Sequence, residues 1–224
     1  MGNKRSYGDA CGIARALDVV GERWALMVVR ELLLGPKRFT DIRAGLPHVS
    51  PDVLAQRLRD LEQAGIVHHR RLPPPYGSQV YELTAGGRAL EPTLVALGRW
   101  GGTYAPPPRD DMCMSLDAHI LSLRTLFDAE RAGDFAARVE LRLDGEHFFV
   151  AIADGAVEAG RGELPDADVV IEADPTILLE VLHGHRRLAD ALAAETIRFS
   201  GDKRKAKRFM TLFPLPVPVA VPVG

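Results

Sequence analysis

Cysteine is scarce in this 224-residue sequence, which contains only Cys11 and Cys113. Two cysteines exclude a disulfide framework, and they cannot supply four thiolates to a structural zinc ion. The sequence also lacks a run of about 18 apolar residues, which argues against a membrane-spanning helix. No apolar stretch with a basic flank opens it, so we expect no signal peptide and a cytoplasmic protein.

Patterns typical of enzymes are missing as well. His183 and His185 flank a turn glycine but have no third ligand at metal-binding spacing. His68 and His69 are neighbours on a predicted strand and point to opposite faces, so they cannot chelate one ion together. No Gly-rich phosphate-binding loop is present. We therefore expect a protein that is not an enzyme and holds neither a metal ion nor a cofactor.

The sequence is apolar enough to fold, and its charge is unevenly distributed. Apolar residues make up 46% of it, which is sufficient for a sizeable core. Residues 1–104 hold 14 Lys and Arg against 10 Asp and Glu, whereas residues 105–224 hold 14 against 20. The first half therefore suits contact with a polyanion, and the second half does not.

Proline marks the boundaries of the predicted domains. The run Pro106-Pro107-Pro108 cannot continue a helix and is typical of a stiff, extended linker. We predict a first domain over residues 1–104, a linker over 105–112, a second domain over 113–214 and an extended Pro/Val tail over 215–224.

A helix with clear start and stop signals lies near the centre of the first domain. Ser50 is a good N-cap, Pro51 suits the first helical position, and Gly65 follows the last turn at Ala64. Two strand-like runs follow, joined by a predicted hairpin tip that contains residues 73–75. The other predicted elements are helices over residues 10–19, 24–32, 39–43 and 85–100 and strands over 66–72 and 79–83. This order is typical of a winged helix-turn-helix.

The helix that begins after Ser50 has two distinct faces. Leu54, Leu58 and Leu61 form an apolar stripe that we expect to face the domain core. Gln and Arg side chains carry donors that read base edges in a major groove, so the other face predicts sequence-specific contact with double-stranded DNA. The residues on that face are Asp52, Val53, Gln56 and Arg59.

Groups suited to the phosphate backbone surround this helix. The Ser50 hydroxyl and the free N–H groups of the first turn suit a phosphate, and so do arginines on a wing. Taken singly, each arginine has an ordinary alternative as solvated surface, so the ordered combination is the more specific signal. The predicted backbone contacts are Lys37, Arg38, Ser50, Arg57, Arg70, Arg71, Tyr76, Ser78 and Gln79.

Two motifs in the first domain point to a known family. A Gly-x-Arg-Trp element ends at Trp24, and a Leu-x-x-Leu-Glu-x-x-Gly element ends at Gly65. Residues 7–101 resemble the HxlR-type branch of the MarR-like winged-helix regulators. The segments that carry this resemblance are 11–24, 30–39, 42–47, 50–65 and 81–87. The resemblance implies a homodimer, joined through the first helix and the helix that ends at Trp100, on a two-fold related operator. The proline-rich wing tip departs from the family and puts the wing contacts in doubt more than the helix contacts.

The same resemblance gives Cys11 a possible role. In HxlR-like proteins a cysteine at this position can sense oxidants or electrophiles, which requires a helix N-terminus or a base such as Arg15 to stabilise the thiolate. The alternative is a small apolar residue buried at a helix interface.

The second domain combines helices and strands in an α+β pattern. Asp144-Gly145 and Asp154-Gly155 are hairpin signals, and Pro175 opens a helix. We predict a sheet flanked by helices on one face. The predicted elements are helices over residues 116–127, 175–182, 188–193 and 205–213 and strands over 139–143, 147–152, 168–173 and 197–200.

The two Asp-Gly turns, the strand over 166–173 and segments 174–184 and 197–202 resemble the sterol carrier protein type 2 family. This resemblance, over residues 115–214, implies a hydrophobic tunnel between sheet and helices that takes a lipid-like or other small apolar ligand. Plain core packing is the alternative for every candidate. The predicted ligand-binding residues are Phe127, Phe149, Leu178, Leu182, Leu192, Phe209 and Phe213.

Two functional hypotheses follow. The first is a homodimeric, DNA-binding transcription regulator controlled by a small apolar ligand. The second is a lipid-binding or protein-interaction module whose winged helix contacts protein. The positive balance of residues 1–104 and the polar face of the Ser50 helix favour the first.

Overall fold

A computed structural model describes residues 6–73, 75, 77–104 and 114–217, and the chain forms two compact units. The N-terminal unit spans Met1–Leu94 and the C-terminal unit spans Val95–Gly224. The predicted linker over 105–112 lies outside the described residues, as do Tyr76 and the part of the predicted tail beyond Val217. Among the residues described, no helix is both long and apolar enough to cross a membrane.

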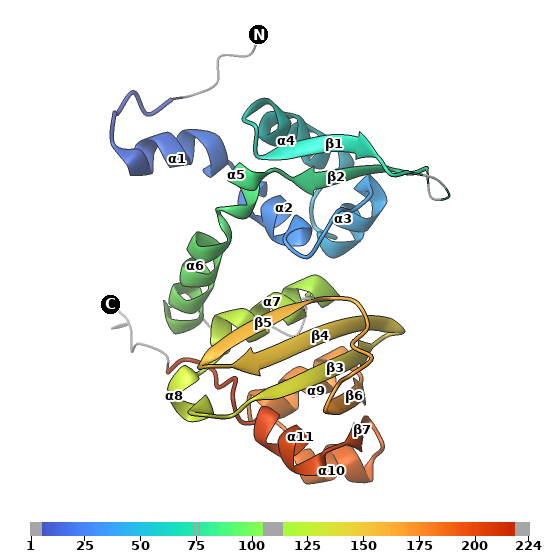
Figure 1. The fold of residues 1–224 in the computed structure, drawn as a ribbon. Coiled ribbons are helices and arrows are strands. Elements are labelled where there is room, and N and C mark those ends of the chain that lie inside the picture. Colours follow the sequence, from blue (N-terminus) through green and yellow to red (C-terminus); the bar gives the residue numbers. More distant parts are fainter. Residues whose placement is uncertain (1–5, 74, 76, 105–113, 218–224) are drawn as a thin grey trace. The chain divides into compact units, whose positions relative to one another are not determined.

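The N-terminal unit has the predicted winged helix-turn-helix order (Figure 1). Pro92 follows the first residue of the last helix, and proline disfavours helical geometry in the residue before it. The single helix predicted over 85–100 is therefore wrong, because the chain breaks it into two. The elements are α1 Gly12–Val20, α2 Ala25–Leu32, α3 Phe39–Gly45, α4 Pro51–Gln63, β1 Val67–Arg71, β2 Gln79–Leu83 and α5 Ala85–Arg88. Helix α6, Glu91–Tyr104, follows them, and its residues from Val95 onward belong to the C-terminal unit.

Helix α4 begins and ends where its sequence signals predict. The Ser50 hydroxyl accepts a hydrogen bond from the Val53 N–H at 3.3 Å, and Gly65 follows the helix with a φ of +71°. Leu54, Leu58 and Leu61 are buried in the core of the unit. The burial of this stripe turns the opposite face of α4 toward solvent.

The turn before α2 gives a physical reason for the Gly-x-Arg-Trp element. Trp24 has a φ of 76°, which is uncommon for a bulky residue and marks local strain. Its ring packs against the core, and the Arg23 guanidinium lies 5.1 Å from the ring centroid. These contacts hold the entry to α2 in one conformation.

The wing is a two-stranded antiparallel sheet. Arg71 pairs with Gln79 and Val67 pairs with Leu83. Lys37 extends the sheet by a short bridge, because its N–H donates to the Tyr81 carbonyl at 3.0 Å and its carbonyl accepts from the Tyr81 N–H at 2.8 Å. The segment between α2 and α3 is thereby fixed to the wing.

The C-terminal unit has the predicted α+β class, with a five-stranded sheet in the order β5-β4-β3-β6-β7. Strands β3 and β6 are parallel and all other neighbours are antiparallel. Helix α7 contacts β5, and α11 contacts β6 and β7 (Figure 1). The elements are α7 Leu116–Leu126, α8 Ala129–Ala132, β3 Ala137–Leu143, β4 Glu146–Ala153, β5 Ala156–Arg161, β6 Val169–Ala173, α9 Pro175–Leu182, α10 Leu188–Ala193, β7 Ile197–Gly201 and α11 Lys203–Phe209.

Both predicted hairpin turns are present. Asp144 and Gly145 have φ values of 50° and 79°, and Asp154 and Gly155 have values of 52° and 69°. Two consecutive positive φ values are the signature of a type I′ turn. The second turn leads into β5, a strand missing from the predicted elements because its Ala, Glu and Gly residues have weak strand propensity. The last helix also differs, since α11 ends at Phe209 and leaves Phe213 beyond it.

One face of this sheet is apolar. Leu141 lies opposite Phe148 and Ile171, and all three side chains are buried. Arg161 emerges on the same face of β5 and meets Asp117 of α7, so this face is the one that the helices cover. The other face carries Glu140, Arg142 and other polar groups, because successive side chains on a strand alternate.

Candidate DNA-binding surface

The exposed face of α4 carries a chain of polar side chains linked to one another. Gln56 donates from Nε2 to Asp60 Oδ1 at 2.8 Å, and Arg59 donates from Nη2 to Gln56 Oε1 at 2.7 Å. The structure exposes all four residues predicted on this face, Asp52, Val53, Gln56 and Arg59. The internal bonds hold an amide and a guanidinium side by side, which are the two groups that read adenine and guanine edges.

Arg57 has a different role from the one predicted. Its guanidinium lies 3.1 Å from Asp60 Oδ2 and 3.6 Å from Glu22 Oε2, and its side chain is largely buried. The pair with Glu22 joins α4 to the turn before α2, whereas the pair with Asp60 lies within α4. Arg57 therefore positions the helix, and its charge is already neutralised inside the unit.

On the wing, the two arginines differ in their partners. Arg70 Nε lies 2.5 Å from Glu82 Oε2, so its charge is compensated across the hairpin. Arg71 donates from Nε to the Gly77 carbonyl at 2.9 Å, a neutral acceptor, and its residue is exposed. Gln79 is exposed and Ser78 is half-buried beside it. Of these two arginines, Arg71 is therefore the one whose charge is not compensated by the carboxylate of Glu82.

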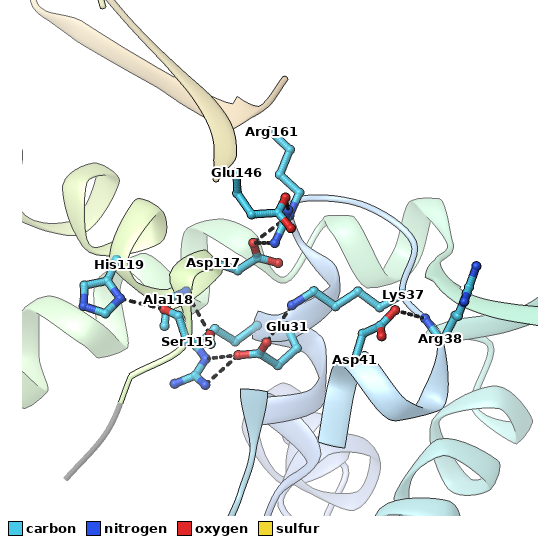
Figure 2. Close-up of polar contacts among 11 residues, drawn as sticks. Glu31, Lys37, Arg38, Asp41, Ser115, Asp117, Ala118, His119, Glu146 and Arg161 are labelled. Atoms are coloured by element: carbon cyan, nitrogen blue, oxygen red, sulfur yellow. Dashed lines mark hydrogen bonds and ion pairs between the residues drawn. The ribbon is translucent and has the colours of Figure 1, made fainter. Parts of the chain in front are cut away.

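A buried carboxylate that sequence reasoning missed lies behind this surface. Glu31 is fully buried, and its two oxygens lie 2.7 Å from Arg30 Nη2 and 2.7 Å from Lys37 Nζ (Figure 2). A Cβ at Gly45 would lie 2.2 Å from Glu31 Oε2, so the α3 backbone approaches the carboxylate closely. The signal was a charge on the apolar side of α2, three residues after Val28.

Lys37 and Arg38, predicted together as backbone contacts, separate in the structure. Lys37 is held by Glu31, so its ammonium stabilises the fold. The Arg38 N–H donates to Asp41 Oδ2 at 3.2 Å, while the residue itself is exposed. His48, which the sequence prediction omitted, is also exposed in the turn just before the Ser50 N-cap.

Helix α1 presents apolar side chains to solvent. Ile13 is 72% exposed and Leu17, one turn further along the helix, is 41% exposed. Cys11 is the N-cap residue of α1 and is exposed in the single chain. An exposed apolar stripe on a helix is typical of a surface that a second subunit covers.

The predicted ligand-binding residues of the C-terminal unit are mostly core. Leu178, Leu182, Phe209 and Phe213 are buried, Leu192 is half-buried, and the rings of Phe209 and Phe213 lie 4.9 Å apart. Phe127 borders a hollow of about 590 Å³ beside residues 214–217. Plain packing therefore accounts for most of the set.

The prediction for Phe149 is wrong. It pairs with Glu140 and Gly160, and a Cβ at Gly160 would lie 2.7 Å from its ring. The ring therefore lies over Gly160 on the polar face of the sheet, whereas the adjacent Phe148 enters the core. Alternation along β4 decides between the two aromatic residues.

The polar face of the sheet is ordered around Glu140, which is almost fully buried. It accepts hydrogen bonds from Arg142 Nε at 2.8 Å and the Leu164 N–H at 3.3 Å, and lies 3.0 Å from His147 Nδ1. Burial raises the pKa of Glu140, but these bonds together lower it further, so the net shift is below the ordinary value.

Comparison with known proteins identifies both domains. Residues 19–109 match the HxlR-like helix-turn-helix family, and residues 121–214 match the SCP-2 sterol transfer family. The uncharacterized HTH-type transcriptional regulator YvaP of Bacillus subtilis is 37% identical over 93 residues, which cover 42% of this chain and 86% of YvaP. The chain belongs to the HxlR-like helix-turn-helix family. It carries a C-terminal domain of the SCP-2 sterol transfer family in addition.

A second relative supports the assignment of the HxlR-like domain. The HTH-type transcriptional regulator YodB of Bacillus subtilis is 35% identical over 98 residues, which cover 44% of this chain and 87% of YodB. The structure of reduced YodB is 32% identical and covers 45% of this chain and all of that chain, with a TM-score of 0.40. Both relatives named here are HTH-type transcriptional regulators.

Proposed function

We propose that this protein is a sequence-specific transcription regulator that binds double-stranded DNA as a homodimer. The observation that carries the proposal is the exposed, internally bonded Gln56 and Arg59 pair on a helix whose other face is buried. A rigid recognition helix with donors held on its outer face is the element that enters a major groove in winged helix-turn-helix proteins.

In this proposal, Gln56 and Arg59 read base edges and Asp52 and Val53 contact the flanking bases. The capped first turn of α4 and the Ser50 hydroxyl meet a phosphate, as helix N-termini do. The other proposed backbone contacts are Arg38, His48, Arg71, Ser78 and Gln79. Lys37, Arg57 and Arg70 support these contacts from within the fold, because each already pairs with a carboxylate.

Dimer formation is supported by apolar side chains that the chain leaves exposed. Ile13 and Leu17 are exposed on α1, and Leu97, Trp100 and Tyr104 are exposed on α6. Burying such side chains stabilises an interface by about 25 cal/mol for each Å² of apolar surface. We propose that α1 and α6 form the homodimer contact, with Cys11 beside it as an oxidant sensor.

The C-terminal domain is proposed to bind the effector. The relationship to the SCP-2 sterol transfer family supports an apolar or lipid-like ligand. The alternative, a lipid-binding or protein-interaction module whose winged helix contacts protein, has the same support from the C-terminal domain. It lacks support from α4, where the outer face carries polar donors suited to base edges.

The first experiment is a fluorescence-anisotropy titration of the full chain against a duplex from its own upstream region, with a scrambled duplex as competitor. The proposal is supported if the protein binds the upstream duplex and the logarithm of its affinity falls linearly with the logarithm of the salt concentration. This dependence is expected because a protein that neutralises phosphates releases their counterions. Stoichiometry of two chains per duplex would support the homodimer. Equal affinity for both duplexes, followed by failure to select any genomic fragment, would contradict DNA recognition.

A further inference from the structure

Helix α11 concentrates positive charge in the acidic half of the chain. It holds five Lys and Arg within residues 203–208, while residues 105–224 as a whole carry 20 acidic against 14 basic residues. Asp202 caps the helix, because its Oδ1 accepts from the Arg204 N–H at 2.8 Å and the Lys205 N–H at 3.0 Å. Ala206 and Phe209 are buried, so the helix is anchored and its basic side chains are turned outward.

A cavity of about 370 Å³ lies beside this basic face. Phe135 and Ala136, just before β3, form an apolar side, and Arg204, Lys205 and Arg208 form the other side. Its volume lies within the range of about 300–1,000 Å³ that is usual for small-molecule sites. Among the residues that the structure describes, no acidic side chain borders it.

The three cations at this cavity differ in how far they are neutralised. Lys205 Nζ lies 2.9 Å from Asp168 Oδ1, so its charge is compensated. Arg208 donates to the Arg131 carbonyl and to Thr211 Oγ1, which are neutral acceptors. The Arg204 side chain is exposed and makes neither an ion pair nor a hydrogen bond within the described part of the chain, although its charge acts on the nearby Asp202 carboxylate. The guanidinium groups of Arg204 and Arg208 therefore face the cavity, and neither forms an ion pair with a carboxylate among the described residues.

Arg204 and Arg208 are four residues apart, which places them on the same side of α11. Guanidinium groups bind phosphate through paired, charge-assisted hydrogen bonds, and a phosphomonoester carries a charge of about −1.5 to −2 that matches two arginines. Phe135 and Ala136 offer an apolar surface on which a ring or a short alkyl group can pack. The site thus combines an anion-binding side with an apolar side.

We propose that this cavity binds an organic phosphate, with the phosphate held by Arg204 and Arg208 and the apolar body packed against Phe135. None of the seven residues predicted for a lipid tunnel borders it, so it is a separate site. Binding itself does not depend on DNA recognition. Only the further step, that the bound phosphate alters operator affinity, rests on the proposed function.

The test is isothermal titration calorimetry of the full chain with phenyl phosphate, inorganic phosphate, benzoate and benzyl alcohol. Phenyl phosphate should bind most tightly, inorganic phosphate more weakly, and benzyl alcohol not measurably. Arg204→Gln breaks no internal contact and should weaken phenyl phosphate about tenfold, which corresponds to the loss of one charge-assisted contact. Phe135→Ala should reduce the affinity for phenyl phosphate to the affinity measured for inorganic phosphate.

Arg187→Gln is the matched control, because Arg187 is an exposed arginine of the same unit outside the cavity. The proposal is overturned if phenyl phosphate does not bind, if it binds no better than inorganic phosphate, or if Arg187→Gln weakens it as much as Arg204→Gln. Binding to phosphatidic acid vesicles without binding to phenyl phosphate would overturn it in favour of a membrane surface. Loss of non-specific duplex affinity in Arg204→Gln, again without phenyl phosphate binding, would overturn it in favour of a DNA contact.

Discussion

Each unit of this protein has a helix that buries a carboxylate at a junction with another element, and the two junctions are built differently. In the N-terminal unit, Glu31 of α2 binds Arg30 and Lys37 against the close backbone of Gly45. In the C-terminal unit, Asp117 of α7 binds Arg161 of β5 at 2.6 Å (Figure 2). The Arg161 guanidinium also lies 2.9 Å from Glu146 and 4.9 Å from the Phe148 ring centroid.

This difference predicts how strongly a substitution at each carboxylate destabilises its unit. Glu31 is the common partner of Arg30 and Lys37, so its removal takes the same carboxylate away from two bases. Asp117 is one of several partners of a single arginine, so its removal leaves Arg161 with Glu146 and the ring. We therefore expect the N-terminal junction, which joins α2 to α3 and to the segment before it, to tolerate substitution less well than the C-terminal one.

The largest effect should come from Glu31→Ala. Breaking a buried ion pair by removing one partner costs up to about 3–5 kcal/mol, and Arg30 and Lys37 are only 22% and 12% exposed. Chemical denaturation of the full chain, followed by circular dichroism, should show the N-terminal unit unfolding at much lower denaturant concentration. Gly45→Ala should act in the same direction, since its Cβ would collide with the Glu31 carboxylate. A stability loss no larger than that of an exposed substitution such as Glu62→Ala would break the comparison.

Asp117→Asn should have a smaller effect, about 1–3 kcal/mol on the C-terminal unit. The amide retains hydrogen-bonding capacity, and Arg161 keeps its contacts with Glu146 and Phe148. The same denaturation experiment measures this change. If Asp117→Asn proved more damaging than Glu31→Ala, the contrast between the two junctions would be reversed.

The C-terminal unit should also lose stability in mild acid. Burial lowers the pKa of His119, and burial followed by the charge of His185 lowers the pKa of His183. In the unfolded chain the pKa of each imidazole is about 6.5. Below that pH the unfolded chain binds protons that the folded chain does not, so the free energy of unfolding falls as pH drops. Thermal melting between pH 7.5 and 5.5 should show this slope, and the double variant His119→Asn/His183→Asn should flatten it. An unchanged slope in that variant would contradict the assignment.

The smallest predicted effect separates the two wing arginines. Arg71→Ala should weaken all duplexes alike and reduce the salt slope by about 1, because one phosphate contact is lost. Arg70→Ala should change the slope less, because Arg70 is already paired with Glu82. Salt-dependent anisotropy titrations measure both variants, and equal slopes for the two would show that the wing contacts are misassigned.

The two units also differ in how much their sequences predict. The bounds of α4 follow from Ser50, Pro51 and the leucine stripe, because capping and periodicity are local properties. Phe149 was misplaced because the choice between adjacent Phe148 and Phe149 depends on pairing with Leu141 and Glu140, which lie on another strand. Local signals therefore identify α4, the helix proposed to bind DNA, whereas cavities and charge partners arise from residues that are distant in the chain.

The partners of Lys37, Arg57 and Arg70 illustrate the same limit. Each is a base in a stretch that favours polyanion binding, but each meets a carboxylate that only folding brings near. The buried Glu31 was visible in principle as a charge on an apolar helix face. Its partner Lys37, six residues further on, could not be assigned without the bridge between Lys37 and Tyr81.

The most direct test of the account is the ratio of operator affinity to scrambled-duplex affinity, measured by competition for the parent chain, Gln56→Ala and Gln63→Ala. Gln63 is an exposed glutamine at the end of the same helix and serves as the matched control. The account predicts that Gln56→Ala lowers this ratio, by a factor that corresponds to about 1–3 kcal/mol of discrimination free energy, the usual value of one bidentate base contact. Gln63→Ala should leave the ratio unchanged. An unchanged ratio in Gln56→Ala, with the variant folded, would contradict the claim that this face of α4 reads the DNA sequence.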